Sequence, residues 1–455
     1  MKTGAGRAVP VADLLAEAVQ GRVPGIALVA PEGEWSWAAL SAAVDRRADE
    51  LREAGTQPGA VVPVTLEADA AGILTLLALW RVGAIPAPLN PKLTEPERRM
   101  AVAALMGARA AALSGAQAVL WTSGTSGRPR GVALSADNLR ASARAAAGRL
   151  GLGPDDVWLA SLSVAHVGGL ALVTRSLLLG GTLVAWGRFT AVSTSALLRG
   201  AHLPAGRPVT HASLVPTQLH QLLEERAGGP PPPPSTFRCA LVGGAHAPPE
   251  LVRRALEAGW PLALTYGMTE MASQVATAVP GEVRRKPGTV GKPLEGVGVR
   301  VAGDGEVLVR GPTLALGYVG DDAPLTDPEG WHHTGDLGHF DDEGDLWITG
   351  RRAERIVSGG VNVDVHEVEG VLRGHPSVRD ACVVGLPDPE WGEVVGAAVV
   401  GVEGEFDLES VESWLRERLS AAKRPRRWRL VQHLPLNANG KVDRGAVRSS
   451  LLEGA

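Results

Sequence analysis

Hydrophobic and polar positions follow two periodicities that alternate along the first part of the chain. Apolar residues at every third or fourth position predict amphipathic helices, and short apolar runs between turn residues predict buried strands. The expected helices span residues 35–54, 73–82, 136–150, 167–179, 216–226 and 249–258. The expected strands span residues 61–66, 84–89, 157–162, 182–186, 209–214, 239–242 and 261–266. This alternation is typical of parallel sheets covered by helices, so the pattern predicts doubly wound α/β sheets.

The pattern changes near Gly288. Short apolar pieces, such as residues 305–311, are separated by Gly, Pro and Asp turns and predict a small antiparallel β-barrel or sheet. The acidic residues 341–345 are superficially similar to a calcium-binding loop. They lack the terminal glutamate of such a loop, and an apolar Leu-Trp-Ile run follows them, so a hairpin turn is the better interpretation.

The C-terminal part of the chain has a pattern of its own. It predicts a helix at 365–372, strands at 378–385 and 394–402, and a helix at 408–419. These elements suit a small, separate α+β domain that joins the rest of the chain near residues 350–353. We therefore expect an N-terminal domain over residues 1–350 and a C-terminal domain over residues 351–455.

Composition and charge narrow the class of protein. The 455 residues are 45% hydrophobic and 21% charged, which suits a soluble globular protein of two or three domains. A net charge of -4 gives no electrostatic reason to expect nucleic acid or a membrane as a partner. Cys239 and Cys382 form no CxxC pair, which favours a reducing cytoplasm over a disulfide scaffold or zinc site. No apolar run reaches about eighteen residues, so no membrane span is expected.

A glycine-rich segment after an apolar run has the composition of a phosphate-binding loop. Glycine lets backbone N–H groups approach phosphate oxygens, and hydroxyl side chains add donors. The residues concerned are Thr122, Ser123, Gly124, Thr125, Ser126 and Gly127, followed by the cation Arg130. A Walker loop is excluded, because Pro129 stands where the spacing from Gly124 requires glycine. Taken alone, the run would also suit a flexible surface linker.

Four further motifs follow this loop along the chain. The Tyr-Gly-Met-Thr-Glu segment at residues 266–270 follows a predicted strand and offers an aromatic face, a hydroxyl and a carboxylate. Asp336 ends a Thr-Gly-Asp turn, and the cations Arg351 and Lys441 follow. Each alone has an ordinary explanation: a helix-terminal glutamate, a turn aspartate or solvated charges. Their joint occurrence in this order is what points to a nucleotide site.

Taken together, these motifs resemble those of the adenylate-forming superfamily of acyl-CoA synthetases, firefly luciferases and nonribosomal peptide adenylation domains. The resemblance runs from about residue 12 to 450. Residues 237–245, 266–275 and 356–362 are most similar to the o-succinylbenzoate–CoA ligase subfamily of menaquinone biosynthesis. The resemblance implies ATP, Mg²⁺ and coenzyme A as cofactor and co-substrates. It implies formation of an acyl-adenylate and then of an acyl-CoA thioester.

The resemblance also implies where the phosphates and the metal bind. The loop at residues 122–130 would hold the β and γ phosphates, with Arg130 as a catalytic cation. Glu270 and Thr125 would hold Mg²⁺, and Thr269 would assist. The expected arrangement neutralises charge where the carboxylate of the acid meets the α-phosphate.

The nucleoside would be held by two other segments. Tyr266 would stack on the adenine, and Asp336 and Arg351 would take the ribose hydroxyls. The backbone beside the nucleotide would come from Gly243, Gly244, Ala245, Gly267, Met268 and Thr269.

Lys441 would bridge the substrate carboxylate and the α-phosphate during the first half-reaction. The C-terminal domain would then rotate about a hinge at Ala353 for the second. In that state the loop of Ser358, Gly359 and Gly360 would line the path of the pantetheine arm.

The acid itself would lie near His166, at the position where many acyl-CoA ligases carry histidine. A satisfied core histidine is the alternative interpretation of this residue. Ser273 and Gln274 would contact the distal carboxyl of a dicarboxylate. Amino-acid-activating relatives usually carry an aspartate near His166, and its absence argues against an amino-acid substrate. The resemblance implies a small-molecule aromatic acid as the substrate.

The chain departs from the family pattern in three places. Arg130 stands where lysine is usual, which keeps the charge and changes its geometry. Residues 363–366 read Val-Asp-Val-His in place of the usual Tyr-Pro, so the coenzyme A contacts of that loop are in doubt. The connector at residues 91–117 is short, which leaves open whether an edge strand or surface helix is present.

Other functions stay open on the sequence alone. The enzyme could adenylate another aryl or acyl acid and transfer it to coenzyme A or to a carrier protein. A nucleotide-binding homologue without turnover is the non-enzymatic alternative. The exact acid, the domain orientation and a possible homodimer are not fixed by the sequence.

Overall fold

The computed structural model describes residues 10–20, 25–107, 113–122, 130–203, 207–225, 233–321, 323–437 and 440–453. Contacts group the chain into two units. The N-terminal unit comprises Met1–Arg300, Leu308–His333 and Asp341–Leu346. The C-terminal unit comprises Val301–Val307, Thr334–Phe340 and Trp347–Ala455, and so contains the whole of the predicted C-terminal domain.

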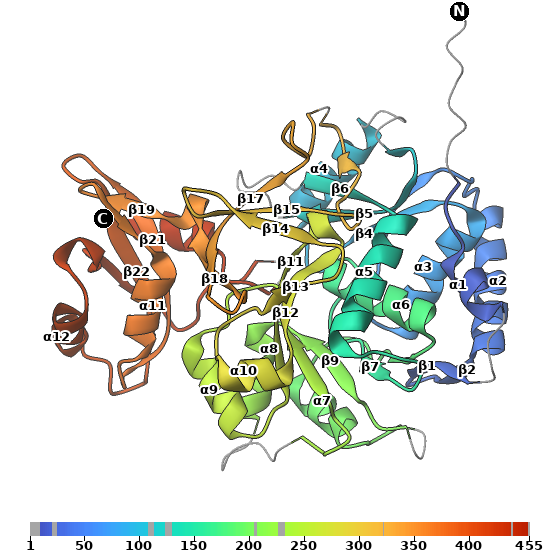
Figure 1. Cartoon of the computed structure of the whole chain (residues 1–455), viewed down its shortest axis with the longest axis horizontal. Coiled ribbons are helices and arrows are strands. Elements are labelled where there is room, and N and C mark those ends of the chain that lie inside the picture. Colours follow the sequence, from blue (N-terminus) through green and yellow to red (C-terminus); the bar gives the residue numbers. More distant parts are fainter. Residues whose placement is uncertain are drawn as a thin grey trace, which may run out of the picture. The chain divides into compact units, whose positions relative to one another are not determined.

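A nine-stranded sheet forms the centre of the N-terminal unit (Figure 1). Its order is β13 (Lys292–Pro293), β12 (Ser273–Ala278), β11 (Leu262–Met268), β10 (Cys239–Val242), β9 (His211–Leu214), β7 (Val157–Leu159), β8 (Thr182–Val184), β1 (Ile26–Ala30) and β2 (Gly33–Ser36). The strands from β11 to β1 pair in parallel, and the strands at both edges pair antiparallel. The parallel sheet predicted from the alternating pattern is therefore confirmed.

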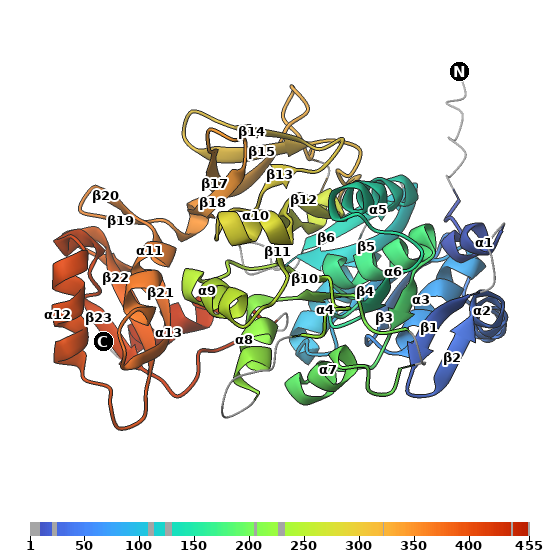
Figure 2. The same ribbon diagram turned by 60° about the horizontal axis from the view of Figure 1, so that its bottom comes forward.

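Neighbouring residues of these strands alternate between two hydrophobic cores. Leu28 and Leu241 belong to one core, and Val29 and Val242 belong to the other. Strands point successive side chains to opposite faces, so both faces of the sheet are buried. The first core also takes residues of α1 (Leu14–Val19), α2 (Trp37–Glu53), α3 (Ala70–Val82), α5 (Ala136–Leu150) and α6 (Val167–Leu179). The second takes residues of α7 (Ala191–Leu198), α8 (Pro216–Glu224) and α9 (Pro249–Glu257), as Figure 2 shows from another side.

Two smaller sheets belong to the same unit. β3 (Val61–Thr65) pairs in parallel with β4 (Ile85–Leu89), and β5 (Ala116–Thr122), β6 (Arg130–Ser135) and β16 (Gly317–Tyr318) form an antiparallel sheet. The short connector after Asn90 carries the helix α4 (Glu95–Met106), which begins with a capping box of Thr94 and Glu97. A surface helix is therefore present there. The unit also contains α10 (Pro280–Arg285) and the 3-10 turn η2 (Thr269–Met271).

The predicted small antiparallel barrel or sheet is a four-stranded sheet. Its order is β14 (Gly298–Val301), β15 (Glu306–Arg310), β17 (His332–Phe340) and β18 (Leu346–Arg351). The acidic residues 341–345 connect the neighbouring strands β17 and β18, which confirms the predicted hairpin turn. Asp341 accepts the backbone N–H groups of Glu343 and Asp345 at 3.0 Å, and the ammonium of Lys286 donates to Asp341 at 2.7 Å.

The C-terminal unit has a five-stranded sheet with helices on both faces. β20 (Val361–Val363), β19 (Ile356–Ser358), β22 (Gly392–Gly401) and β21 (Val378–Asp388) follow one another, and β23 (Arg427–Leu430) pairs with β22. One core joins this sheet to α11 (Val365–Arg373) and α12 (Leu408–Arg418), and a second joins it to α13 (Arg444–Glu453). Two 3-10 turns, η3 (Arg352–Glu354) and η4 (Ala421–Lys423), complete the unit. The predicted helix, strand, strand, helix order is present, with α13 and three short strands added.

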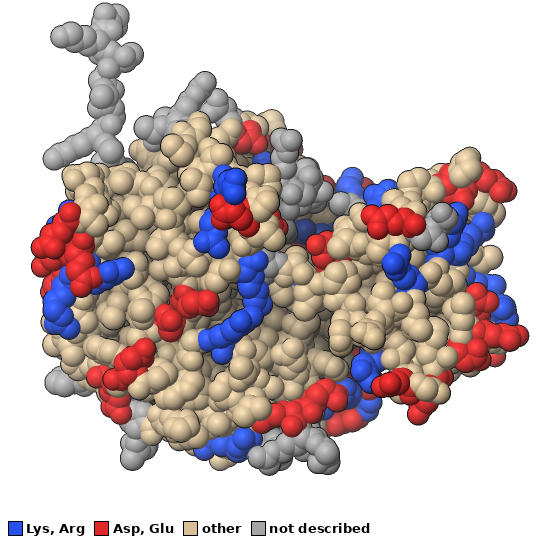
Figure 3. Space-filling view, turned by 180° about the vertical axis from the view of Figure 1, so that it is seen from behind, with Lys and Arg blue, Asp and Glu red and all other residues tan. Residues whose placement is uncertain are grey.

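Charged side chains of both signs are interspersed on the face of the molecule shown in Figure 3. In the described part of the chain, no helix is long and apolar enough to cross a bilayer. The two cysteines are free and buried.

Candidate active site

The ends of the predicted phosphate loop are fixed on a hairpin. β5 and β6 pair antiparallel, with Thr122 opposite Arg130 at the open end. Thr122 is half-buried and Arg130 is exposed. The predicted phosphate-binding residues Ser123, Gly124, Thr125, Ser126 and Gly127 lie outside the described residues.

Arg130 is connected to Glu270 through a tyrosine that no sequence motif marked. The guanidinium of Arg130 lies 3.5 Å from the ring centroid of Tyr318 and forms an ion pair with Asp321 at 2.8 Å. The hydroxyl of Tyr318 donates to Oε1 of Glu270 at 2.9 Å. Burial and the negative charge of Glu270 raise the pKa of Tyr318, so the tyrosine keeps its proton and remains a donor. The predicted metal ligand is thus oriented by a neighbour from a distant segment.

The segment at residues 266–270 ends β11 and enters a tight turn into β12. Ala272 and Ser273 have φ angles of 50° and 119°, a left-handed backbone that L-residues rarely adopt. Gly267 lies beneath this turn, and a Cβ there would come within 2.0 Å of the carbonyl oxygen of Ser273. Glycine is therefore required at 267. The turn holds Thr269 and Glu270, both half-buried, at the carboxyl end of a central strand.

The predicted adenine-binding segments lie side by side. β10 and β11 are parallel neighbours. Gly243 comes directly after β10 and Tyr266 lies near the end of β11, so both residues lie toward the same edge of the sheet. A Cβ on Gly243 would lie 2.5 Å from Cγ2 of Thr265, and Gly244 has a left-handed φ of 80°. The two glycines let the backbone before Ala245 turn closely past the neighbouring strand.

His166 lies at the N-terminal end of α6 and contacts Asn90. Its Nε2 is 2.9 Å from Nδ2 of Asn90, and the Oδ1 of that amide accepts the backbone N–H of Lys92 at 2.9 Å. Because the amide NH₂ is a donor, this contact favours the neutral imidazole with its proton on Nδ1. No sequence motif marked Asn90 as a site residue.

Gln274, a predicted substrate residue, is held inside the protein by a buried arginine. Gln274 and Arg175 are each 2% exposed, and Nη2 of Arg175 donates to Oε1 of Gln274 at 2.6 Å. The amide nitrogen of Gln274 donates to Thr277 at 2.7 Å. The hydroxyl of Ser273, the other predicted substrate residue, lies 3.5 Å from the same guanidinium. Ser273 is half-buried, so the two residues have different access to a ligand.

Burial fixes the charge states around Arg175. Desolvation lowers the pKa of Arg175 to about 10, which leaves it charged at neutral pH. Desolvation and the charge of Arg175 lower the pKa of His211 to about 4, and His211 stacks on Trp158 at 4.7 Å. Desolvation raises the pKa of Cys239 to about 12. His211 therefore stays neutral and Cys239 stays a thiol beside a buried cation.

In the C-terminal unit, Asp336 and Arg351 form an ion pair between adjacent strands. Nε of Arg351 lies 2.5 Å from Oδ1 of Asp336, and Asp336 is 5% exposed. The β17 backbone before Asp336 is held by Thr334, whose hydroxyl donates to the carbonyl of Val307 at 2.6 Å and accepts the N–H of Asp336 at 3.0 Å. Gly335 adopts a φ of 70°. The tight turn expected at this motif is wrong: Thr334, Gly335 and Asp336 lie within β17, and the left-handed Gly335 is an irregularity inside that strand.

Lys441 belongs to a turn, and its ammonium interacts electrostatically with the same pair. Its backbone N–H donates to Oδ1 of Asn437 at 3.1 Å, and its carbonyl accepts the N–H of Asn437 at 2.7 Å. Lys441 as a whole residue is exposed, but protein around its ammonium desolvates the charge and lowers its pKa. Arg351 lowers it further, while Asp336 and Glu354 act in the opposite direction. Three predicted site residues from distant parts of the sequence therefore lie within electrostatic reach of one another.

The predicted coenzyme A loop is a two-residue hairpin turn between β19 and β20. Gly359 and Gly360 have φ angles of 56° and 81°, and Ser358 pairs with Val361. Ser358 is buried as a whole residue, so only the two glycines of this turn are exposed to a ligand. A Cβ on Gly359 would lie 2.5 Å from the ring of Trp391. The same indole is contacted by Arg426, whose guanidinium lies 3.9 Å from the ring centroid.

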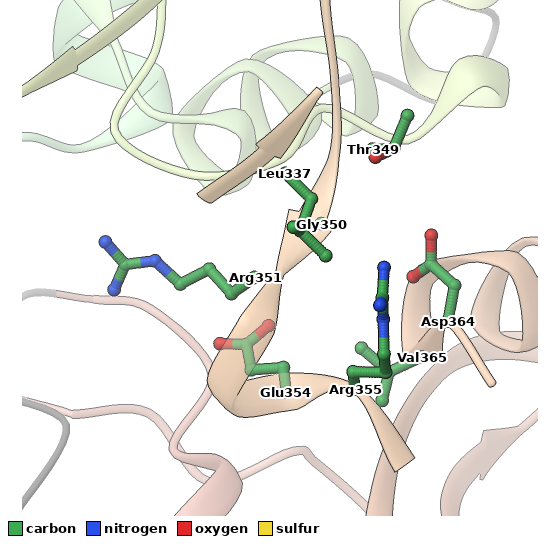
Figure 4. Close-up of a pocket in the computed structure, with 8 residues that line it drawn as sticks. All are labelled: Leu337, Thr349, Gly350, Arg351, Glu354, Arg355, Asp364 and Val365. Carbon is green, nitrogen blue, oxygen red and sulfur yellow. The ribbon is translucent and has the colours of Figure 1, made fainter. Parts of the chain in front are cut away.

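A small pocket adjoins Arg351 (Figure 4). Its volume is about 30 Å³, room for one or two water molecules. The lining residues are Leu337, Thr349, Gly350, Arg351, Glu354, Arg355, Asp364 and Val365. Arg351 and Glu354 point to the same side of the chain in Figure 4. The pocket is too small for a nucleotide, so we assign it no ligand.

With this geometry in hand, comparisons with known proteins define the class. Residues 15–112 and 108–319 match the family of AMP-binding enzymes, and residues 367–441 match the AMP-binding enzyme C-terminal domain. The chain belongs to the family of AMP-binding enzymes.

Within that family, several relatives are named for one activity. The 2-succinylbenzoate–CoA ligase of Bacillus anthracis (strain A0248) is 38% identical over 349 residues, which cover 74% of this chain and 70% of the relative. The o-succinylbenzoate CoA synthetase of Bacillus subtilis, solved with its acyl-adenylate intermediate, matches with a TM-score of 0.86 and 29% identity over 97% of this chain and 98% of that one.

The same Bacillus subtilis enzyme with ATP and a magnesium ion also matches with a TM-score of 0.86. Its sequence is 29% identical, over 98% of this chain and 100% of that one. The resemblance inferred from the motifs is confirmed, and so is the fold class of a large α/β part followed by a small α+β part.

Proposed function

We propose that the chain is an ATP-dependent acid–CoA ligase that acts on o-succinylbenzoate. In the first step the acid carboxylate attacks the α-phosphate of ATP, forming the acyl-adenylate and releasing pyrophosphate. In the second, the thiol of coenzyme A attacks the acyl carbonyl and AMP leaves. The observation that carries the proposal is the convergence of Asp336, Arg351 and Lys441, together with relatives of the same named activity.

For the nucleotide, Asp336 would accept the ribose hydroxyls, and Arg351 would hold that carboxylate in place. Tyr266 would stack on the adenine beside the glycine turn at residues 243–245. Lys441 would neutralise the carboxylate and the α-phosphate as they are joined. The lowered pKa of Lys441 reflects desolvation at the ammonium, which strengthens its field on a phosphate.

The single carboxylate of Glu270 would suit a Mg²⁺ ion that is held mainly by the phosphates of the nucleotide. This cation prefers oxygen ligands and often takes one or two carboxylates together with substrate phosphates and water. Glu270 offers one carboxylate, oriented by Tyr318, and the hydroxyl of Thr269 is adjacent in the chain. Among the described residues, no three His, Cys, Asp or Glu side chains form a cluster for a metal. When bound, Mg²⁺ would neutralise charge on the leaving pyrophosphate.

For the acid, His166 would contact the aromatic end with its orientation fixed by Asn90. Ser273 would contact the distal carboxyl. Gln274 would act at one remove, because its amide holds the Arg175 guanidinium beside Ser273. The positive charge of Arg175 favours a dicarboxylate over a simple fatty acid.

For coenzyme A, the pantetheine arm would pass along the Gly359-Gly360 turn. Trp391 contacts both Gly359 of that turn and the guanidinium of Arg426. Arg426 belongs to the basic stretch at residues 423–429. We assign Arg426 to the phosphates of coenzyme A. Residues 351–455 would rotate about Ala353 between the two half-reactions, and a homodimer and a cytoplasmic location remain predictions.

A panel of acids tests the substrate. We expect o-succinylbenzoate to exceed benzoate and octanoate in kcat/KM by at least about tenfold, the cost of one lost polar contact. AMP formation that depends on coenzyme A is the measurement, with pyrophosphate release measured in parallel. Equal turnover of octanoate would contradict the choice of acid. Pyrophosphate release without AMP release on adding coenzyme A would point to a carrier-protein acceptor.

A further inference from the structure

A buried cluster of four charged groups in the C-terminal unit has no part in the chemistry proposed above. It consists of Glu354 in η3, His366 and Glu369 in α11, and Arg444 in α13. His366 lies between the two carboxylates, with Nε2 3.5 Å from Glu354 and Nδ1 3.4 Å from Glu369. Arg444 reaches the same two carboxylates, at 3.4 Å from Glu354 and 2.5 Å from Glu369. The cluster therefore pairs two cations with two anions.

Burial makes this pairing necessary. The side chains of Glu369 and His366 are 3% and 18% exposed, and an unpaired charge there would be strongly unfavourable. Burial lowers the pKa of His366, but hydrogen bonds to Glu354 and Glu369 outweigh it and raise the pKa to about 9. His366 is therefore charged at neutral pH, and the four groups sum to zero. Arg373 also pairs with Glu369, at 3.4 Å, and its charge is balanced by Asp380 at 2.7 Å.

The cluster is anchored to the sheet of the unit. Glu369 accepts the backbone N–H of Val383 at 2.9 Å, and Arg444 donates to the carbonyl of Val383 at 2.8 Å and approaches Cys382. α11 and α13 are thus tied to one point of β21. Glu354 is the member of the cluster that comes from outside this core.

Two members of the cluster, Glu354 and Arg444, are close in sequence to two candidate active-site cations. Glu354 follows Arg351 by three residues, and Arg444 follows Lys441 by three residues. Figure 4 shows Glu354 pointing to the same side of the chain as Arg351. The charges of Arg351 and Glu354 both act on Lys441. The cluster therefore sets the spacing of the two segments that carry these cations.

We propose that His366 is a positioning residue: through Glu354 and Arg444 it holds Arg351 and Lys441 at the spacing that acyl-adenylate formation requires. This inference rests on the roles proposed for Arg351 and Lys441. A displacement of about 1 Å can cost up to about a hundredfold in rate, because preorganised charges act only in the correct geometry. The thioester step uses the Gly359-Gly360 face and does not need this spacing.

Three variants of the full chain test the inference. His366→Gln keeps a hydrogen-bonding side chain and removes the charge, and His366→Lys keeps a permanent positive charge. His375→Ala is the control, since His375 lies in the same unit and contacts Ser377 and Ser410 instead. ATP–pyrophosphate exchange with o-succinylbenzoate measures the first step. Release of AMP from synthetic acyl-adenylate and coenzyme A measures the second.

We expect His366→Gln to slow the first step by about tenfold and to leave the second within threefold of the wild type. His366→Lys should recover the first step to within threefold, and His375→Ala should match the wild type in both. A normal first step in His366→Gln would overturn the inference. Equal slowing of both steps, with no recovery in His366→Lys, would also overturn it, because His366 would then only maintain the fold.

Lys441→Ala, measured alongside, separates this inference from the proposed function. A slowed first step in Lys441→Ala beside an unaffected His366→Gln would overturn the inference about His366 alone. An unchanged first step in Lys441→Ala would overturn the role of the lysine, and the inference with it.

Discussion

Tyr318 shows how single residues from distant segments define the state of this site. The guanidinium of Arg130 lies over the ring of Tyr318, and the hydroxyl of Tyr318 donates a hydrogen bond to the carboxylate of Glu270. A carboxylate that accepts a fixed hydrogen bond has fewer orientations to lose when it binds a metal. Asn90 likewise limits the orientation of the His166 ring and sets its tautomer.

Tyr318→Phe should weaken the response of the enzyme to Mg²⁺. The substitution removes only the hydroxyl, so the ring contact with Arg130 remains, while Glu270 loses a hydrogen bond worth about 1.5–3 kcal/mol for a charged acceptor. We expect ATP–pyrophosphate exchange to fall by about tenfold at limiting Mg²⁺, with partial recovery at high Mg²⁺. A Mg²⁺ titration that superimposes on the wild type would remove Tyr318 from the site.

At the scale of elements, the β19–β20 hairpin packs against Trp391 and so helps to position Arg426. Two consecutive left-handed glycines make the turn tight enough for Trp391 to pack on it, and Arg426 covers the indole. Cation–π contact holds the guanidinium in one place at the protein surface. A fixed guanidinium suits phosphate binding.

Arg426→Ala should raise the KM for coenzyme A by about fivefold or more, the loss of one exposed charge contact of about 1 kcal/mol. ATP–pyrophosphate exchange should not change, because no coenzyme A takes part in it. Arg416→Ala is a matched control, since Arg416 is an exposed arginine of α12 that pairs with Glu412. The same KM in both variants would leave Arg426 without a role in coenzyme A binding.

α11 should make the stability of the C-terminal unit dependent on pH. His366 has a folded pKa of about 9, above its ordinary 6.5, so its contribution is complete below about pH 6.5 and is lost as pH rises through 9. Denaturant titrations at pH 6.5 and 9.5 should show a fall in unfolding free energy of about 1–3 kcal/mol. In His366→Gln this component of the fall should disappear, and an identical pH dependence in the two proteins would contradict the assignment.

At the scale of the whole molecule, the chain divides into two units, and the proposed chemistry needs groups from both. Glu270 and His166 belong to the N-terminal unit, and Asp336, Arg351 and Lys441 belong to the C-terminal unit. We propose that residues 351–455 rotate about Ala353, which would present Lys441 in the first step and the glycine turn in the second.

Ala353→Pro tests the rotation directly. Proline fixes φ near -65° and restricts the residue before it, so the hinge loses much of its range. We expect the first step to stay within a few-fold of the wild type. Release of AMP from synthetic acyl-adenylate and coenzyme A should slow by about a hundredfold or more, since the second arrangement is out of reach. Equal rates of both steps in this variant would argue against a hinge at Ala353.

The sequence alone was sufficient for the elements with strong periodicity. The alternation of helices and strands up to residue 266 defined the parallel sheet, and motif order defined the family. Boundaries were less well determined: the helix expected at residues 35–54 begins at Trp37, because Ser36 caps it and residues 33–36 form β2. α13 was not predicted, since only Val447 and Leu451 of its residues are buried and its periodicity is weak.

Motifs named the residues that we propose for the chemistry, and the tertiary structure decided which neighbours hold them. Tyr318 meets Glu270, Asn90 meets His166 and Arg175 meets Gln274 only in the folded chain. No local pattern announces such partners, because hydrogen bonds and ion pairs form wherever folding brings segments together, at any separation in the sequence. Periodicity and motif spacing are local properties and were available from the sequence. The charge of His366 and the convergence of Arg351 with Lys441 depend on burial and distance, which exist only in three dimensions.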